Sequence, residues 1–103
     1  MPDRKMAGGQ TERGHTDWKP YDPKKPRGIY VEVDTSDANF KSVPAYVMSL
    51  AGDSHNWELI VSIYNEKKDS FRAYARFPDW ATITPQMANE RGWHINWIGV
   101  EVK

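Results

Sequence analysis

Apolar and polar residues alternate most regularly between positions 57 and 77 of this 103-residue chain. Successive side chains of a β-strand point to opposite faces of a sheet, so this pattern predicts strands over 57–64 and 70–77. The charged segment that begins at Asn65 joins them as the turn of a hairpin. The apolar faces of the hairpin are expected to be Trp57, Leu59, Val61 and Ile63 in the first strand, and Phe71, Ala73, Ala75 and Phe77 in the second.

Shorter alternating runs predict three more strands, over 29–34, 45–50 and 93–102. The last strand has Trp93, Ile95 and Trp97 on one face and large apolar residues on the other, which indicates a central strand or a face covered by another subunit. Thr84 suits an N-cap, Pro85 a first helical position and Gly92 a C-terminal stop, so residues 85–91 are expected to be the only helical piece. Short strands with turn residues between them predict an all-β, antiparallel β-sandwich over residues 15–103. We expect Leu59, Val61, Phe71, Ala73 and Ile95 in its core.

The first 27 residues differ from the rest in charge and composition. They hold seven Lys or Arg against four Asp or Glu, whereas residues 28–103 hold seven against ten. Residues 1–14 are polar and contain Gly8-Gly9, which predicts a flexible N-terminal arm, free or ordered against a neighbouring subunit. Three prolines in residues 19–27 favour an extended or turning path, which Trp18 and Tyr21 would pin to the domain. A basic arm for nucleic acid is the alternative to a solvated tail, but no dense basic run is present, and we expect no nucleic-acid partner.

The sequence lacks the motifs of several classes of function. It has no cysteine, and no apolar run long enough to insert into a membrane. His15, His55 and His94 lack the spacing of metal ligands, and neither a phosphate loop nor a nucleophile motif is present, so we expect no metal, no cofactor and no catalytic residue. The polar N-terminus does not resemble a secretory signal, which predicts cytoplasmic synthesis and leaves release or association with a particle open.

The thirteen aromatic residues are numerous for a chain of this size and suggest a binding function. Asp79 beside Trp80 is the best candidate, because sugars lay C–H faces on aromatic rings and donate hydroxyl hydrogen bonds to carboxylates. The alternative is a tryptophan that closes the end of the sandwich while Asp79 accepts loop amides. Two further clusters, for which a purely structural role is the stronger reading, are His15 with Asp17 and Trp18, and Asp53 with His55 and Trp57.

Five segments in order resemble the H-type lectin domain, the family of the snail agglutinins and the C-terminal discoidin domain. They are Phe40-x-x-x-Pro44, Ser49-Leu50, Ser62-Ile63-Tyr64, Ser70-Phe71-Arg72-Ala73 and Ile95-Asn96-Trp97-Ile98-Gly99-Val100-Glu101. The resemblance implies a six-stranded sandwich that forms a homotrimer and binds galactose or N-acetylgalactosamine near the contacts between protomers. It also implies site positions at Glu58, where the family has an arginine, at residues 78–80, where it has a Trp-His pair, and at residues 15–18.

Two hypotheses of function follow. The first is an oligomeric glycan-binding module, which would gain affinity by presenting several weak sites at once. The second is a structural or assembly module, such as a subunit or decoration of a phage or virus particle. In either case we expect a homotrimer whose contact includes Ile98 and Val100, with contributions from Tyr64, Tyr74 and Arg76.

Overall fold

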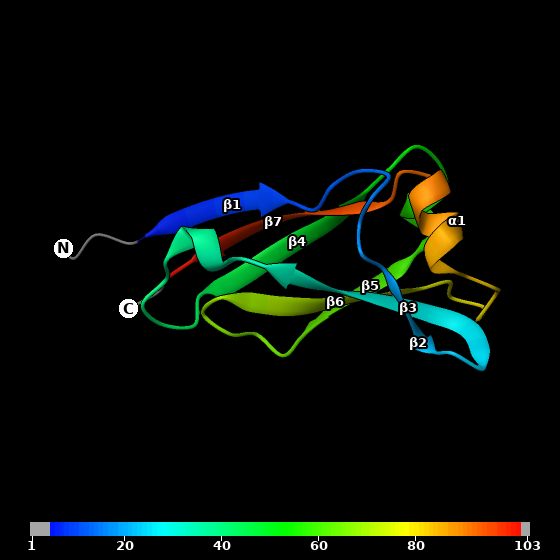
Figure 1. Cartoon of the computed structure of the whole chain (residues 1–103), viewed down its shortest axis with the longest axis horizontal. Coiled ribbons are helices and arrows are strands. Elements are labelled where there is room, and N and C mark those ends of the chain that lie inside the picture. The colour runs from blue at the N-terminus through cyan, green and yellow to red at the C-terminus, as the bar shows by residue number, and fades with distance from the viewer. Residues whose placement is uncertain (1–4, 102–103) are drawn as a thin grey trace.

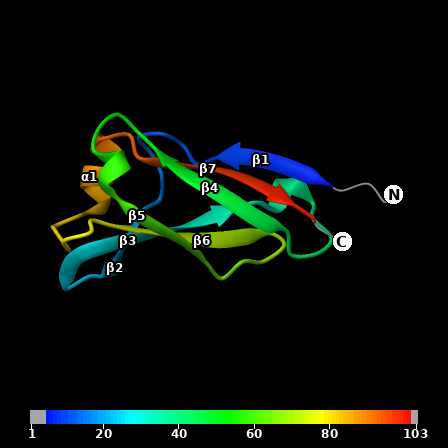
Figure 2. The same ribbon diagram turned by 180° about the vertical axis from the view of Figure 1, so that it is seen from behind.

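A computed structural model describes residues 5–101, which form seven strands in two antiparallel sheets. The strands are β1 (Met6–Gln10), β2 (Lys19–Asp22), β3 (Lys25–Asp34), β4 (Ala45–Ala51), β5 (Ile60–Tyr64), β6 (Ser70–Arg76) and β7 (His94–Val100). One sheet has the order β1-β7-β4 and the other β2-β3-β6-β5. The sheets lie face to face as a β-sandwich, and the one α-helix of these residues, α1 (Pro85–Glu90), lies at one end of it (Figures 1 and 2). The predicted fold class is therefore confirmed, with seven strands in place of six.

The predicted hairpin is formed by β5 and β6, with Val61 opposite Ala75 and Ile63 opposite Ala73. Its first strand begins at Ile60, whereas the alternation predicted a start at residue 57. Residues Asn56–Glu58 form a 3-10 turn instead, which leaves the Trp57 side chain 83% exposed. The expected inward position of Trp57 was wrong because the turn ends the strand geometry on which the alternation depends.

The last strand, β7, is the centre of its sheet, between β1 and β4. Trp93, Ile95 and Trp97 are buried in the core, as the alternation predicted. Ile98 belongs to the opposite face and is 49% exposed. The apolar residues on both faces of the strand therefore mark a central strand with one face covered by the other sheet.

The N-terminal segment differs from the flexible arm expected for residues 1–14. Met6–Gln10 forms β1, which pairs along β7 from Met6 opposite Val100 to Gln10 opposite Asn96. Gly8 and Gly9 make this pairing possible, because a Cβ at Gly8 would lie 2.9 Å from the Trp97 carbonyl oxygen. A Cβ at Gly9 would lie 3.0 Å from Nε1 of the Trp97 indole. The glycine pair thus permits close approach to the core, while residues 1–4 lie outside the described residues.

The proline-rich segment contributes the other strand that the sequence did not predict. β2 and β3 form a tight hairpin in which the Asp22 carboxylate accepts a hydrogen bond from the Lys24 amide at 2.9 Å. Proline is tolerated here because β2 is an edge strand, whose outer amides need no ladder partner. β3 therefore starts at Lys25, before the predicted position 29.

The predicted helix is confirmed as α1 with its cap. Thr84 accepts a hydrogen bond from the Met87 amide at 3.1 Å, and Gly92 adopts φ +65° just beyond the helix. Ser36–Ala38 and Asn56–Glu58 add two 3-10 turns to the described chain, so α1 is not its only helical piece.

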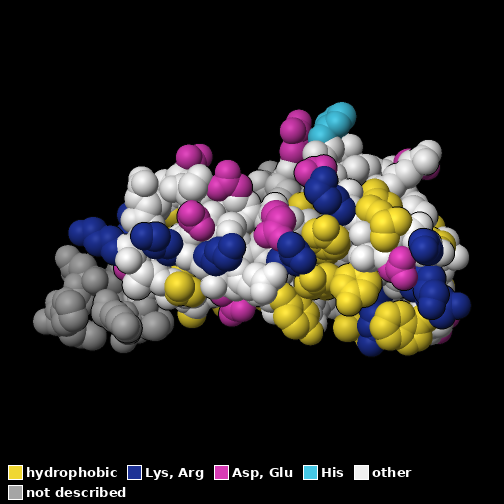
Figure 3. Space-filling model, turned by 60° about the horizontal axis from the view of Figure 1, so that its bottom comes forward, with side chains coloured by type: hydrophobic (Ala, Val, Ile, Leu, Met, Phe, Trp, Pro, Cys, Tyr) yellow, Lys and Arg dark blue, Asp and Glu magenta, His cyan; other side chains and the backbone are white. Residues whose placement is uncertain are grey.

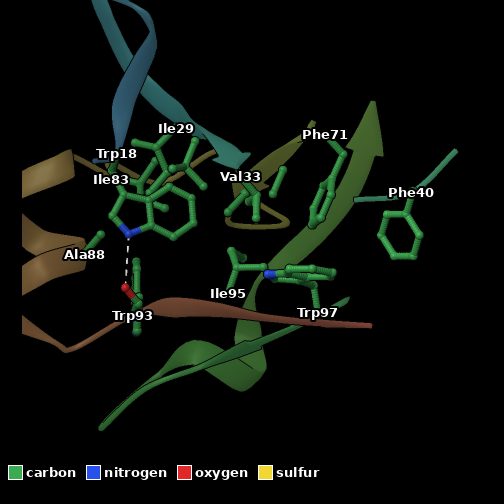
Figure 4. Packing of buried hydrophobic residues seen from close by; sticks show 13 residues of the cluster. Trp18, Ile29, Val33, Phe40, Phe71, Ile83, Ala88, Trp93, Ile95 and Trp97 are labelled. Carbon is green, nitrogen blue, oxygen red and sulfur yellow. Dashed lines mark hydrogen bonds between the residues drawn. The ribbon is translucent and has the colours of Figure 1, made fainter. Parts of the chain in front are cut away.

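The core lies between the two sheets and extends under α1 (Figure 4). Phe71, Ala73 and Ile95 are fully buried, as predicted. Leu59 and Val61 are only half-buried, because β5 is an edge strand and covers the core from one side. The buried apolar residues are Trp18, Ile29, Val31, Val33, Phe40, Phe71, Ala73, Ala75, Ile83, Ala88, Trp93, Ile95 and Trp97.

Candidate functional site

An open groove of about 650 Å³ lies on the outer face of the four-stranded sheet. Its size is that of pockets that enclose small organic ligands, about 300–1,000 Å³. Hydrophobic side chains gather over one part of this face, with Lys and Arg side chains beside them (Figure 3). The groove is lined by Tyr21, Asp22, Lys25, Arg27, Gly28, Ile29, Ile60, Ser62, Tyr64, Tyr74, Ala75, Arg76 and Trp80.

Tyr74 is at the centre of an aromatic cluster built by the strand register. Tyr30 lies opposite it on β3, and their ring centroids are 5.6 Å apart. Tyr21 from β2 meets the Tyr74 ring edge to face at 5.6 Å, and Tyr64 from β5 does so at 5.0 Å. Because Tyr21 and Tyr64 are more than half exposed, they present ring surface to solvent on both sides of Tyr74.

Part of the groove exists because Gly28 has no side chain. This residue lies beside Tyr21, and a Cβ built on it would be 3.5 Å from the Tyr21 Cβ and 3.9 Å from the Ala75 carbonyl oxygen. Both are ordinary contact distances, so the backbone would accept a larger residue. A side chain at this position would project into the groove.

Trp80 forms one wall of the groove and is held in an unusual backbone conformation. Its φ is +61°, a left-handed geometry that costs a non-glycine residue roughly 1–3 kcal/mol. The turn is closed by the Trp80 amide, which donates to the Phe77 carbonyl at 3.1 Å. The Arg76 guanidinium stacks on the indole, 3.9 Å from the ring centroid, and donates to the Phe77 carbonyl at 3.2 Å. These contacts fix the orientation of the indole, while Trp80 remains 54% exposed.

The other arginine of β6, Arg72, contacts residues of the same sheet. Arg72 forms an ion pair with Glu32, donates to the Tyr74 hydroxyl at 3.1 Å and lies 4.5 Å from the Tyr30 ring centroid. The hydrogen bond to Tyr74, and to a smaller extent the one to Glu32, raises the pKa of Arg72 above its ordinary value. This cation therefore orients Tyr30 and Tyr74 from within the sheet.

The structure separates the site residues proposed from the sequence. Trp80 lines the groove, but the neighbouring Asp79 carboxylate accepts the Ala81 amide at 3.1 Å, which is the alternative role considered for it. Glu58 lies on the turn before β5, where its carboxylate forms a hydrogen bond with His55 Nδ1 at 2.6 Å, and it is not among the groove residues. Asp53, from the same connecting loop, forms an ion pair with Arg13.

The cluster expected at residues 15–18 is divided between core and surface. Trp18 is 5% exposed and donates from its indole to the Trp93 carbonyl at 3.1 Å, so its ring offers no stacking surface (Figure 4). Asp17 is exposed and pairs with Lys19 at 3.3 Å. His15 is exposed, and its backbone amide donates to the Glu12 carbonyl. The segment is thus anchored by Trp18, as the structural alternative proposed.

The sequence did not identify Tyr21, Tyr64, Tyr74 and Arg76 as one site. Tyr64, Tyr74 and Arg76 were placed on outward faces of the hairpin, which is correct, but only as contributors to a subunit contact. One feature of the sequence could have indicated the site: large aromatic side chains occupy strand positions that face solvent. Assembling them requires the pairing of β2 with β3 and of β3 with β6, which connects segments far apart in the chain.

Comparison with known proteins assigns no family to the chain. No protein-family model matches it, and a search of curated proteins finds no significant match. Within residues 5–101, no helix is long and apolar enough to span a membrane. The same residues contain no group of three or more histidine and acidic side chains that could hold a metal ion. A functional assignment therefore rests on the groove.

Proposed function

We propose that this protein is a carbohydrate-binding module whose site is the groove on the β2-β3-β6-β5 sheet. The observation that carries the proposal is the cluster of Tyr21, Tyr64 and Tyr74 from three strands, with Trp80 standing beside it. Sugars bind such surfaces because their C–H faces pack on aromatic rings while their hydroxyls take hydrogen bonds from nearby polar groups. Ser62 and the tyrosine hydroxyls provide those polar groups. The resemblance to H-type lectins favours a ring of the galactose or N-acetylgalactosamine type.

Trp80 provides the most direct test of this function. Replacing it with glycine or alanine should weaken glycan binding at least about tenfold, because exposed aromatic anchors dominate the energy of such sites. Trp80→Gly should leave the melting temperature within about 4 °C of the original, the shift that about 1 kcal/mol causes in a small domain. Loss of the Arg76 contact is offset there by relief of the positive φ.

Binding would be measured on a glycan array and then by calorimetry, with thermal unfolding followed by circular dichroism. Trp57→Ala is the matched control, since Trp57 is also exposed but lies outside the groove. Absence of binding to any sugar at millimolar concentration would exclude the proposed function. A large fall in melting temperature with Trp80→Gly would make Trp80 a structural lid.

Self-association is the second part of the proposal. The outer face of the three-stranded sheet exposes Met6, Val47 and Ile98, and Ile98 lies opposite Val47 in the register. We expect this face to bury itself in a homotrimer, which would present three grooves at once and raise avidity for a multivalent glycan.

The prediction is that sedimentation gives about three times the monomer mass and that Ile98→Glu gives a folded monomer. Folding should survive because the Ile98 side chain is half exposed in the single chain. Gln86→Glu, with the same charge change on an exposed position of α1, is the control and should leave the mass unchanged. A wild-type monomer at micromolar concentration would contradict the trimer.

The exposed apolar face also supports a second candidate function. If the groove binds no sugar, the same face would serve an assembly module that packs against another subunit of a larger particle. Retained self-association together with an empty groove is the result that would favour this alternative.

A further inference from the structure

Positive charge is concentrated along the groove. Lys25, Arg27 and Arg76 are among its lining residues, against one carboxylate, that of Asp22. Lys and Arg side chains border the hydrophobic cluster on this face (Figure 3). A neutral sugar would need no such excess of positive charge, because it binds through hydrogen bonds to its hydroxyls and through packing of its ring on aromatic side chains.

These cations are not neutralised within the described chain. Its ion pairs join Arg13 to Asp53, Lys19 to Asp17, His55 to Glu58 and Arg72 to Glu32, so residues 5–101 hold no acidic partner for the three groove cations. The Asp22 carboxylate accepts the Lys24 amide. Arg76 is oriented by Trp80 and by two backbone carbonyls, to which it donates through Nη1 alone. Its other guanidinium hydrogens are therefore available to an acceptor on a ligand.

The same sheet is acidic beyond the groove, which limits how far negative charge on a ligand can extend. Asp34 and Asp69 lie together near the other end of β3, beside Lys67 and beside Glu32, which pairs with Arg72. Hydrogen bonds from Ser36 hold the pKa of Asp34 below its ordinary value, so this carboxylate stays ionised. A strand of nucleic acid laid along the sheet would bring phosphates to these carboxylates, whereas a ligand with one anionic group would avoid them.

We infer that the groove binds a saccharide carrying a single anionic group, a carboxylate or a sulfate ester. The sugar ring would lie on Tyr21, Tyr64 and Tyr74, with the anion toward Lys25, Arg27 and Arg76. This inference rests on the proposed carbohydrate function and names the class of sugar. Charge-assisted hydrogen bonds from these cations would add to the stacking.

Three sugars that differ only at C6 test the inference: galactose, galacturonate and galactose 6-sulfate. Each would be titrated into the full-length protein while backbone amide shifts are followed by nuclear magnetic resonance. At about 20 mM salt the two anions should bind roughly five- to tenfold more tightly than galactose, and most of this difference should disappear at about 300 mM salt. The two anionic probes also distinguish a carboxylate site from a sulfate site.

A pair of double variants separates local recognition from net charge. Lys25→Gln with Arg27→Gln should remove most of the preference for the anionic sugars over galactose, because only Arg76 of the three groove cations remains. Lys67→Gln with Lys68→Gln makes the same charge change in the β5–β6 turn and should leave the preference intact. Unchanged melting curves would show that both variants are folded.

The possible negative results distinguish the acidic-sugar inference from the proposed carbohydrate function. Equal affinity for galactose and the two anions would overturn the acidic-sugar inference and leave the carbohydrate function standing. No binding of any of the three at millimolar concentration would overturn both. Tighter binding of a deoxythymidine oligonucleotide to the same amides would overturn both in favour of a single-stranded nucleic-acid site.

Discussion

Replacing Trp93 with alanine should lower the free energy of unfolding by about 3–5 kcal/mol, the cost of deleting a buried tryptophan. The Trp93 side chain is fully buried directly before β7 (Figure 4). Its indole donates to the Ser54 carbonyl at 2.8 Å, and its own carbonyl accepts the Trp18 indole at 3.1 Å. The ring also packs edge to face on Phe77. Since a small domain is stable by only about 5–15 kcal/mol, this loss removes a large share of its stability and should lower the urea concentration at the midpoint of unfolding markedly.

Trp57→Ala is the matched control, because the same side chain is removed from a position that is 83% exposed. Its effect should be within about 0.5 kcal/mol, as for most surface substitutions. Urea unfolding followed by tryptophan fluorescence and circular dichroism would measure both variants. Similar losses at the two positions would show that Trp93 does not carry the packing described above.

The contrast between these tryptophans shows where sequence reasoning succeeds. Alternation placed Trp93 correctly because this residue directly precedes β7, whose seven regular residues keep each side chain on its face. It misplaced Trp57, because the turn Asn56–Glu58 interrupts the pattern two residues before β5 begins. Trp18 has no periodic context, and its burial depends on Trp93, which follows it by 75 residues.

Long-range pairing explains the remaining differences in the fold. The polar sequence of β1 carries little strand signal, and its stability comes from β7 and from the space left by Gly8 and Gly9. The groove was missed for the same reason. Its rings come from β2, β5 and β6 and from the turn that holds Trp80, and each of them looks like an ordinary surface residue in its own segment. Trp80 alone was proposed, because it stands beside an acidic residue in a loop.

Gly28→Ile should weaken ligand binding at least about tenfold, or 1.4 kcal/mol, while preserving the fold. An isoleucine there would fill the space beside Tyr21 that a sugar ring needs. The strand should tolerate it, since the backbone has no positive φ at Gly28 and the built Cβ makes only ordinary contacts. Isoleucine also favours strands more than glycine does, so the melting temperature should stay the same or rise.

A graded series makes this prediction sharper. Gly28→Ala fills less of the groove and should weaken binding less than Gly28→Ile, because the loss follows the volume of the side chain. Gln86→Ile places the same side chain on an exposed position of α1, outside the groove and outside the exposed apolar face, and should leave affinity unchanged. Calorimetry with the best ligand from the glycan array would give the three affinities. Full binding by Gly28→Ile would place the ligand elsewhere on the protein, whereas a graded loss at constant melting temperature would locate it between Tyr21, Tyr74 and Trp80.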